Sequence, residues 1–393
     1  MKIESFQLEL ITPCFCGGAE PEKQAEIRAP SIRGQLRWWF RTLGGFKSLA
    51  PMSVRDQEAM IFGTTAGDEG QAGKLILRVA SQTLAEAANA DDLEAGMGTP
   101  LGYALFPLRS SRDGDGKRGI LGTGVSFRLT LLWRGSPDVW SSLRSLVLAW
   151  ANLGAMGFRA RRGFGSIWLK SPSTIELPGI DLALQAFSSP ESINVKALKE
   201  FVPQTWRGVT AILLNRYRSW RQHGQMNRRW DKNSQRWIPI SEGQREENRK
   251  APGFRYARRD HNEGLDVQGT SAPAGDGERP AGKFGTTFRP ALGLPIIQHF
   301  SSLGSDHGPI KRWVATVNWG LEPSRGAPKG RFASPVLLRP HRDAQGRWHA
   351  LVIFVDAHKW PAGKKVFLNG QERDVSLDLY EAMKADPALM PFI

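Results

Sequence analysis

Hydrophobic and polar positions follow regular periods over roughly the first 170 residues of the chain. Alternation with a period of two predicts strands at residues 3–12, 74–80, 125–133 and 166–170, and a further strand is expected at 102–107. Apolar residues at helical spacing predict helices from about residue 31 to 43, at 54–62 and at 137–153. Ser31 is expected to cap the first helix, and Gly44 and Gly45 are expected to end it in a left-handed conformation.

The order of the main elements is strand, helix, strand, strand, helix, strand. This is the split βαβ, ferredoxin-like order, which gives an antiparallel sheet with two helices on one face. The other face of such a sheet is free to bind RNA, as in RNA-recognition modules. The fold class expected from the pattern is therefore α+β.

A chain of 393 residues is long enough for about two domains. A proline-rich junction at 172–178 divides it into residues 1–175 and 176–393. In the second part we expect helix within 196–223, around Trp206 to Trp220, a resumed fold at 292–300, a hairpin of 332–340 with 346–356, and a short helix at 377–385. Residues 224–283 are polar, glycine-rich and basic, and predict a long insertion with disordered parts.

The charge balance sets this chain apart from an ordinary soluble protein. The net charge is +15 and the pI is about 10.1, which favours a polyanionic partner. We expect neither a membrane span nor a signal sequence, because no apolar stretch is long enough to cross a bilayer and the first residues have no apolar signal core. Cys14 and Cys16 are too close for an unstrained bridge and belong to no set of zinc ligands, so we expect a reducing, cytoplasmic compartment and no metal.

One predicted helix carries Arg33, Arg37 and Arg41 on a single face, with Arg28 just before it. Like charges at this spacing repel each other, so a helix that keeps them is expected to face a polyanion. Either Trp38 or Trp39 is expected to stack on a base or brace the groove, as in single-strand binding. The alternative is an amphipathic core helix with a solvated basic edge.

A second candidate is the glycine-rich segment 154–165. Its glycines would let the backbone approach phosphates, and Arg159, Arg161 and Arg162 would add charge-assisted contacts. Phe164 could stack on a base. The segment is not followed by the Gly-Lys-Ser/Thr of a nucleoside triphosphate site. The alternative is a tight helix-to-strand turn with exposed arginines.

Residues 207–260 hold twelve arginines and two lysines against five acidic residues, with aromatic residues between them. Such a stretch suits RNA binding by stacking and counterion release. It could also be a solvated insertion, or dock on an acidic neighbouring subunit. Further candidates are Lys283 and Arg331. The candidates within the basic stretch are Arg218, Arg221, Arg228, Arg229 and Trp230.

The histidines leave an enzymatic alternative open. His223 and His261 lie in the basic region and could serve general acid–base cleavage of RNA without a metal. No nucleophile or paired base accompanies them. His341 and His349 flank the predicted hairpin and are expected to be strand residues.

Several of these motifs together resemble a known family. They are Thr12-Pro13, Gly17-Gly18, the run from Glu26 to Arg41, Glu58 with Ile61-Phe62-Gly63, and the glycine-rich stretch from Arg159 to Ile167. In this order they resemble the RAMP superfamily of CRISPR–Cas proteins, and within it the first-named subunit of the Cmr, or type III-B, effector complex. The match is good over residues 3–170 and looser at Gly293–Ile296 and Arg331–Pro335.

The resemblance implies two ferredoxin-like, RRM-like domains in tandem, the second degenerate. It also implies a non-catalytic subunit of an antiviral ribonucleoprotein that binds the 3′ region of the guide CRISPR RNA, target single-stranded RNA, or both. Partners would be other Cmr-type subunits, with no membrane, cofactor or metal. A metal site at Asp68 and Glu69 is less favoured than a solvated turn. The alternative function is a metal-independent endoribonuclease that processes CRISPR RNA.

Overall fold

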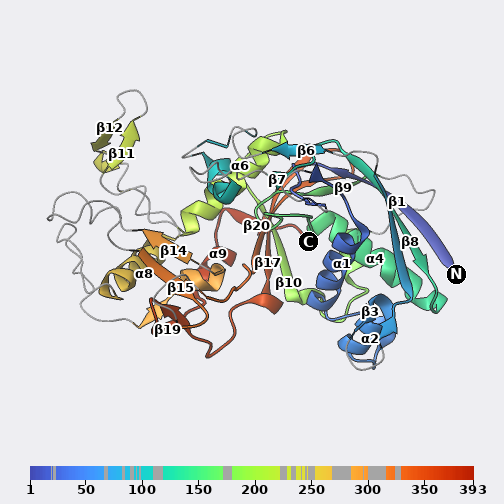
Figure 1. The fold of residues 1–393 in the computed structure, drawn as a ribbon. Helices are drawn as coiled ribbons and strands as arrows, with labels where there is room; N and C mark the ends of the chain where they lie inside the picture. Colours follow the sequence, from blue (N-terminus) through green and yellow to red (C-terminus); the bar gives the residue numbers. More distant parts are fainter. Residues whose placement is uncertain are drawn as a thin grey trace. The chain divides into compact units, whose positions relative to one another are not determined.

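The computed structural model is shown in Figure 1. It describes residues 1–18, 20, 24–65, 70–81, 85–88, 93, 95–96, 99–108, 118–170, 179–221, 228–231, 236–239, 241–243, 246, 253–267, 285–294, 296–299, 316–323 and 329–393. These residues form two compact units. The first contains Met1–Asn215, Val336–Ala357 and Ala388–Ile393, and the second contains Arg216–Pro335 and His358–Pro387. The chain is thus mixed α+β with several antiparallel sheets, as its pattern predicts.

The N-terminal sheet of the first unit has the strand order β5-β8-β1-β9, and its pairs are antiparallel. Its strands are β1 (Lys2–Leu10), β5 (Leu75–Ser81), β8 (Ser126–Trp133) and β9 (Ile167–Lys170). Helices α1 (Ala29–Thr42) and α4 (Trp140–Leu153) follow β1 and β8 in the chain. This order of elements is the split βαβ order expected from the sequence.

Alternation along β1 decides which face of this sheet is buried. Phe6, Leu8 and Leu10 pack in one core with Leu36 of α1 and Leu146 of α4. The intervening Ser5 and Gln7 are exposed. Because side chains alternate across a strand, the polar positions lie on the face opposite to the helices.

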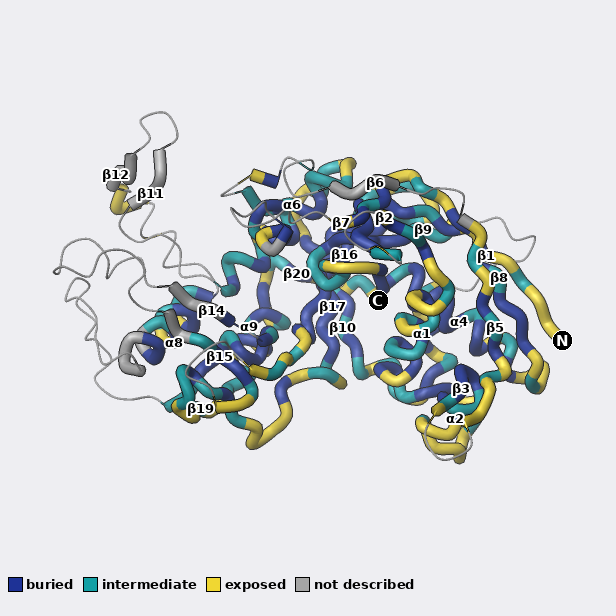
Figure 2. Tube along the Cα trace, viewed as in Figure 1, coloured by how far each residue is buried: buried dark blue, intermediate teal, exposed yellow. Residues whose placement is uncertain are grey.

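A second four-stranded sheet also belongs to the first unit, and its strand order is β16-β17-β10-β20. Its strands are β10 (Ile193–Leu198), β16 (Val336–Arg342), β17 (Trp348–Val355) and β20 (Leu389–Pro391). The β16–β17 hairpin was expected from the sequence, and its register runs from Val336 opposite Phe354 to Arg342 opposite Trp348. Figure 2 shows that β16 and β17 are buried along most of their length.

The second unit has its own sheet and core. The sheet has the strand order β13-β19-β18-β15-β14, and Trp319, Trp360, Val366 and Leu368 form a buried cluster. Its strands are β13 (Thr286–Thr287), β14 (Ile296–His299), β15 (Thr316–Gly320), β18 (Val366–Leu368) and β19 (Gln371–Val375). The unit also holds α8 (Phe254–Val267), α9 (Asp378–Lys384) and the pair β11 (Arg228–Asp231) and β12 (Arg236–Pro239).

The remaining elements are short, apart from α6 (Trp206–Arg221), which spans the chain boundary between the units. They are α2 (Val54–Phe62), α3 (Pro100–Ala104), α5 (Ile180–Leu184), β2 (Gln24–Ala25), β3 (Gly63–Thr64), β4 (Gln71–Ala72), β6 (Ala85–Ala88), β7 (Arg118–Gly119) and the 3₁₀ turns at Lys47–Leu49, Phe106–Leu108, Pro137–Val139, Pro190–Ser192, Arg289–Leu292 and Asp356–His358. No helix in the described part of the chain is long and apolar enough to cross a membrane.

Two local expectations are wrong. Helix α1 begins at Ala29, two residues before the expected cap, because Pro30 fits its first turn, and Arg28 precedes it without a side-chain cap. The strand expected at 102–107 is instead helix α3, since Thr99 caps it by accepting a hydrogen bond from the amide of Gly102. The expected left-handed end of α1 is confirmed at Gly44 and Gly45 (φ 76° and 75°).

The junction expected at 172–178 lies outside the described residues, and so does much of the expected insertion at 224–283. The division of the chain at residue 175 stays a prediction.

Candidate nucleic-acid interface

The three arginines of α1 share one face, as their spacing predicts, but an acidic residue also contacts that face. Arg37 Nε donates to Glu58 Oε1 at 2.6 Å, and an amino group of Arg41 donates to the same oxygen at 2.8 Å. Arg33 donates to the carbonyl oxygen of Phe62 at 3.1 Å. The Glu58 carboxylate therefore offsets the repulsion between the neighbouring guanidinium groups.

Glu58 lies on α2, which is capped by Ser53 through a hydrogen bond from the amide of Asp56. Its side chain is mostly buried, whereas those of Arg37 and Arg41 keep 35% and 49% of their surface exposed. A carboxylate fixed on one side of both guanidinium groups leaves their exposed edges for a second anion. The sequence motif contained Glu58, but its spacing alone did not mark it as the partner of the arginines.

Helices α1 and α2 border an open cleft of about 620 Å³. Three arginines line it together with two acidic residues, so its formal charge is positive by one. Polar groups from β3 and β4 complete the wall. The lining residues are Arg37, Arg41, Ser53, Arg55, Asp56, Glu58, Ala59, Gly63, Thr64 and Gln71. Exposed guanidinium groups around a cleft of this size suit phosphate groups of a polyanion.

The two tryptophans of α1 have different environments. Trp39 is 1% exposed and belongs to the core, so base stacking by this residue is excluded by its burial. Trp38 is half-buried, meets Trp39 edge to face at 5.1 Å, and carries the Arg161 guanidinium 5.2 Å from its ring centroid. Trp38 thus braces the glycine-rich segment 154–165 against α1.

Glycines shape this segment into a tight turn before β9. Gly165 has φ 67°, and a Cβ added there would lie 1.9 Å from the carbonyl oxygen of Met156. The amide of Met156 in turn donates to the carbonyl oxygen of Gly165. The amide of Phe158 donates to the carbonyl oxygen of Phe15 at 2.8 Å. The segment is therefore held by its own backbone and by the chain after β1.

The arginines of the segment are held at different places. Arg162 donates to the carbonyl oxygens of Arg161 and Val336. Burial, followed by the charge of Arg162, lowers the pKa of Arg161. Arg159 lies over the ring of Phe158 at 5.0 Å. All three arginine side chains remain half-buried, so the segment presents positive charge from fixed positions.

The prediction that Phe164 of this segment stacks on a base is wrong. Phe164 is 0% exposed and packs on Phe15 at 5.9 Å, because the turn directs it into the interior. Phe158 instead keeps 43% of its surface exposed beneath Arg159. Sequence reasoning missed Phe158, which is the available ring of this segment.

The remaining candidates are more scattered. Arg28 is exposed in the first unit and forms an ion pair with Glu26 at 3.4 Å. Arg218, Arg221 and Arg331 belong to the second unit, where Arg331 is exposed and Arg221 lies over the ring of Tyr217 at 5.5 Å. Lys283 lies outside the described residues, as do the side chains of the three candidates in β11, which are Arg228, Arg229 and Trp230.

Two aromatic residues of the basic stretch are structural. Tyr217 and Trp220 of α6 are fully buried. The Trp220 indole donates to Asp386 at 2.6 Å, and Arg216 forms an ion pair with the same carboxylate. These rings stabilise the second unit, so they are not available to stack on RNA.

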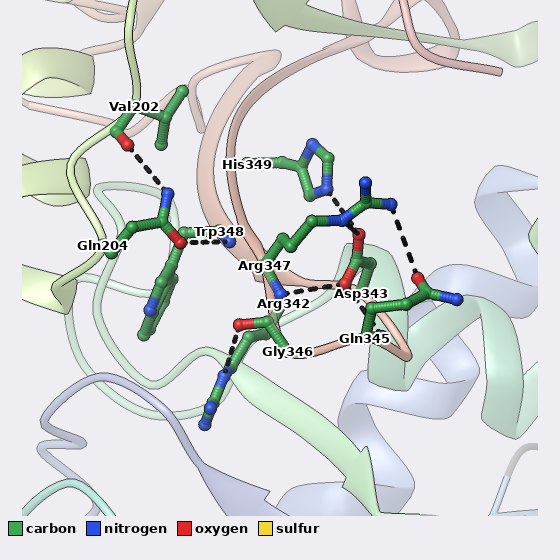
Figure 3. Close-up of polar contacts among 9 residues, drawn as sticks. All are labelled: Val202, Gln204, Arg342, Asp343, Gln345, Gly346, Arg347, Trp348 and His349. Atoms are coloured by element: carbon green, nitrogen blue, oxygen red, sulfur yellow. Dashed lines mark hydrogen bonds and ion pairs between the residues drawn. The ribbon is translucent and has the colours of Figure 1, made fainter.

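The histidines at the hairpin are strand residues, as expected. His341 lies on β16 and His349 on β17, and their positions pair directly. His349 Nε2 lies 3.0 Å from Asp343, and Arg347 donates to the same carboxylate at 2.8 Å (Figure 3). Of the residues proposed for cleavage, His261 is half-buried on α8, and His223 lies outside the described residues.

In the described part of the chain, no three His, Cys, Asp or Glu residues form a group that could hold a metal ion. Cys14 and Cys16 are free thiols in the interior. The turn considered for a metal, with Asp68 and Glu69, lies outside the described residues.

Comparison with known proteins supports the same family as the sequence motifs. Residues 7–168 match the RAMP superfamily. These residues contain helices α1 and α4, the glycine-rich segment and the sheet β5-β8-β1-β9, except for residues 2–6 of β1 and 169–170 of β9. This part of the chain thus matches the RAMP superfamily, and the resemblance seen in the sequence is confirmed.

Within that superfamily the chain is similar to Cmr1 proteins of Pyrococcus furiosus. It is 28% identical to the CRISPR system Cmr subunit Cmr1-1 over 198 residues, which cover 49% of this chain and 54% of that protein. It is 28% identical to Cmr1-2 over 181 residues, which cover 41% of this chain and 92% of that protein. The chain thus spans about half the length of Cmr1-1.

A solved structure extends the likeness of fold over the whole chain. The crystal structure of Cmr1 from Pyrococcus furiosus in its apo form aligns with a TM-score of 0.54 at 16% identity, covering 99% of this chain and 98% of that one. This likeness concerns the fold alone.

Proposed function

We propose that this chain is a non-catalytic RNA-binding subunit of a type III-B CRISPR ribonucleoprotein that acts in antiviral defence. The similarity to proteins named as Cmr subunits supports this assignment. The partners would be other Cmr-type subunits and single-stranded RNA, either the 3′ region of the guide or the target. The cytoplasm is the expected compartment.

One observation carries the proposal. The cleft between α1 and α2 displays Arg37, Arg41 and Arg55, and Glu58 holds two of them in place. Arginines fixed in this way bind phosphates bidentately without reading bases. A guide or target RNA varies in sequence, so a subunit that contacts the backbone suits it.

The glycine-rich segment extends this surface. Trp38 and Arg41 are three residues apart on α1 and therefore neighbours on the helix surface, and Trp38 carries Arg161 on its ring. An RNA strand that leaves the cleft across Trp38 would meet the arginines of the segment. The exposed Phe158 ring beneath Arg159 would offer it a stacking surface.

The two sheets of the first unit support the finer fold proposal. The first has the order β9-β1-β8-β5, which is fourth, first, third and second along the chain. The second has the order β20-β10-β17-β16, which is again fourth, first, third and second. We propose that these are two tandem ferredoxin-like folds, and that the second unit is largely an insertion between β10 and β16.

The test is RNA binding across a salt series. Arg37→Ala and Arg41→Ala should each weaken binding to single-stranded RNA similarly for all sequences. Each should also make the slope of log K against log salt less negative by about 0.7, as expected for one lost phosphate contact on a single strand. Arg134→Ala is the matched control, because Arg134 is exposed beyond the end of β8 and outside the cleft.

Unchanged slopes in both cleft variants would contradict phosphate binding by this cleft. The same samples, kept in EDTA, also test the absence of catalysis. Discrete cleavage products that depend on His223 or His261 would replace the proposal with a metal-independent endoribonuclease.

A further inference from the structure

The edges of the two sheets in the first unit meet at β9 and β16. Arg339 of β16 is fully buried and donates to the carbonyl oxygens of Ile167 in β9 and of Ala151 and Asn152 in the last turn of α4. A guanidinium group is well suited to satisfy several carbonyl groups at once, including those left open at a helix end. The two strand edges are thus fixed beside each other, which also fixes the side chains that follow along them.

Two tryptophans and an arginine meet just beyond this junction. The Arg342 guanidinium lies 4.6 Å from the ring centroid of Trp168 on β9 and 5.8 Å from that of Trp348 on β17. Arg342 and Trp348 are paired positions of the hairpin. Arg342 Nε donates to the carbonyl oxygen of Gly346 at 3.1 Å, and in Figure 3 its terminal nitrogens point away from the hairpin turn.

The position of Trp168 in the sheet is informative. Trp168 pairs with Glu9 of β1, whose neighbours Leu8 and Leu10 are buried against the helices. Trp168 therefore lies on the opposite, polar face of the sheet, and its side chain is half-buried. A large ring on such a face gains less from burial than one in the core, which suggests that a ligand completes its contacts.

Charges around the pair of rings leave a small positive excess. Arg342 and Lys170 lie at the Trp168 ring, and Lys170 pairs with Glu9. Arg347 and Asp343 pair with each other beside His349, on the side of the hairpin away from Trp348 (Figure 3). A ligand here would gain most of its binding from ring contacts and little from net charge.

We propose that Trp168, Arg342 and Trp348 form a nucleobase-stacking site for single-stranded RNA, with Arg342 available to the adjacent phosphate. This proposal rests on the proposed RNA-binding function and adds a site on different strands from the α1–α2 cleft. Stacking on aromatic rings accepts any base, because every base has a π-face. The site is therefore compatible with a variable RNA sequence.

The experiment compares tryptophan variants in RNA binding over a salt series. Trp168→Ala and Trp348→Ala should each weaken binding about 5- to 160-fold, the range that corresponds to about 1–3 kcal/mol for loss of one base stack. The salt slope should stay unchanged, since no phosphate contact is lost. Trp168→Phe and Trp348→Phe should retain most of the affinity, because they keep a ring and guard against misfolding of the alanine variants.

Trp206→Ala is the matched control. Trp206 is also half-buried in the first unit and also carries an arginine over its ring, Arg207 at 5.0 Å. The Trp206→Ala variant should bind RNA with an affinity within about twofold of that of the wild type, a change well below that expected for the loss of one base stack. Photo-crosslinking with 5-iodouridine RNA should in addition label peptides that contain Trp168 or Trp348.

Two failures can be distinguished. If the wild type binds RNA but both alanine variants bind equally well and neither peptide crosslinks, the stacking site is wrong and the cleft proposal stands. If the wild type binds no single-stranded RNA at low salt, both proposals fail.

Discussion

Gly34 provides a test in which stability and RNA binding should change in opposite directions. It lies in the middle of α1 and is exposed, and a Cβ added there would meet nothing within 4 Å. Glycine in a helix costs about 0.5–1 kcal/mol relative to alanine. No neighbouring atom requires a glycine at this position. The cost is explained if RNA passes close to this turn of α1, beside Arg37 and Trp38 on the next turn.

The magnitude follows from the size of one methyl group. Gly34→Ala should raise the free energy of unfolding by about 0.5–1 kcal/mol. The methyl would hold an RNA backbone about 1.5 Å further from the helix. Moving one charge pair from about 4 to about 5.5 Å, at an effective dielectric constant of about 20, weakens its Coulomb attraction by about 1 kcal/mol. This corresponds to about fivefold weaker RNA binding.

Urea unfolding and RNA-binding titration of the same variant measure both changes. Gln35→Ala, one residue further along α1, is the control, and it should change neither quantity by more than about 0.5 kcal/mol. A Gly34→Ala variant that is more stable yet binds RNA as tightly as the wild type would refute the passage of RNA over α1. A less stable variant would refute the argument from open space.

Two further predictions concern buried or mostly buried ionisable groups. Glu58→Gln should tighten RNA binding and steepen the salt slope by about 0.7, because Arg37 and Arg41 lose their neutralising partner. It should also lower stability by about 1–2 kcal/mol, since two charge-assisted bonds to partly exposed arginines are weakened; weaker binding by a folded variant would contradict this assignment. Burial, with the charges of Arg339 and His349, lowers the pKa of His341 to about 3. The folded state favours neutral His341, so the contribution of this residue to the free energy of unfolding is complete above about pH 6.5 and is lost as the pH falls toward 3. Between pH 7 and pH 5, the free energy of unfolding of the wild type should therefore fall by about 2 kcal/mol more than that of His341→Gln. Urea unfolding at the two pH values measures this, and parallel losses in both proteins would contradict it.

Local patterns predicted the elements that depend on local interactions. The periods of β1, α2 and β8 were clear, and the structure places these elements within one or two residues of the expected positions. Strand β10 was not predicted, because its partners β17 and β20 lie more than 150 residues away in the chain. The prediction of a strand at 102–107 was wrong because Thr99-Pro100, which begins helix α3, was not taken as a helix-capping signal.

The candidate site shows the same limit. The spacing of the arginines on α1 predicted their common face, but their contact with Glu58 depends on how α2 packs against α1. In the glycine-rich segment, sequence could not distinguish Phe164 from Phe158. The choice depends on the pairing of Phe158 with Phe15, a residue in a distant part of the sequence. Charge and spacing therefore locate the surface, whereas packing decides which of its residues reach a ligand.

The most direct test is binding of the purified chain to labelled single-stranded RNA over a salt series in EDTA, with RNA length measured in the same samples. The account predicts intact RNA, bound with similar affinity whatever its sequence, and a steep negative slope of log K against log salt. Absence of binding at low salt, or discrete shorter products, would contradict it.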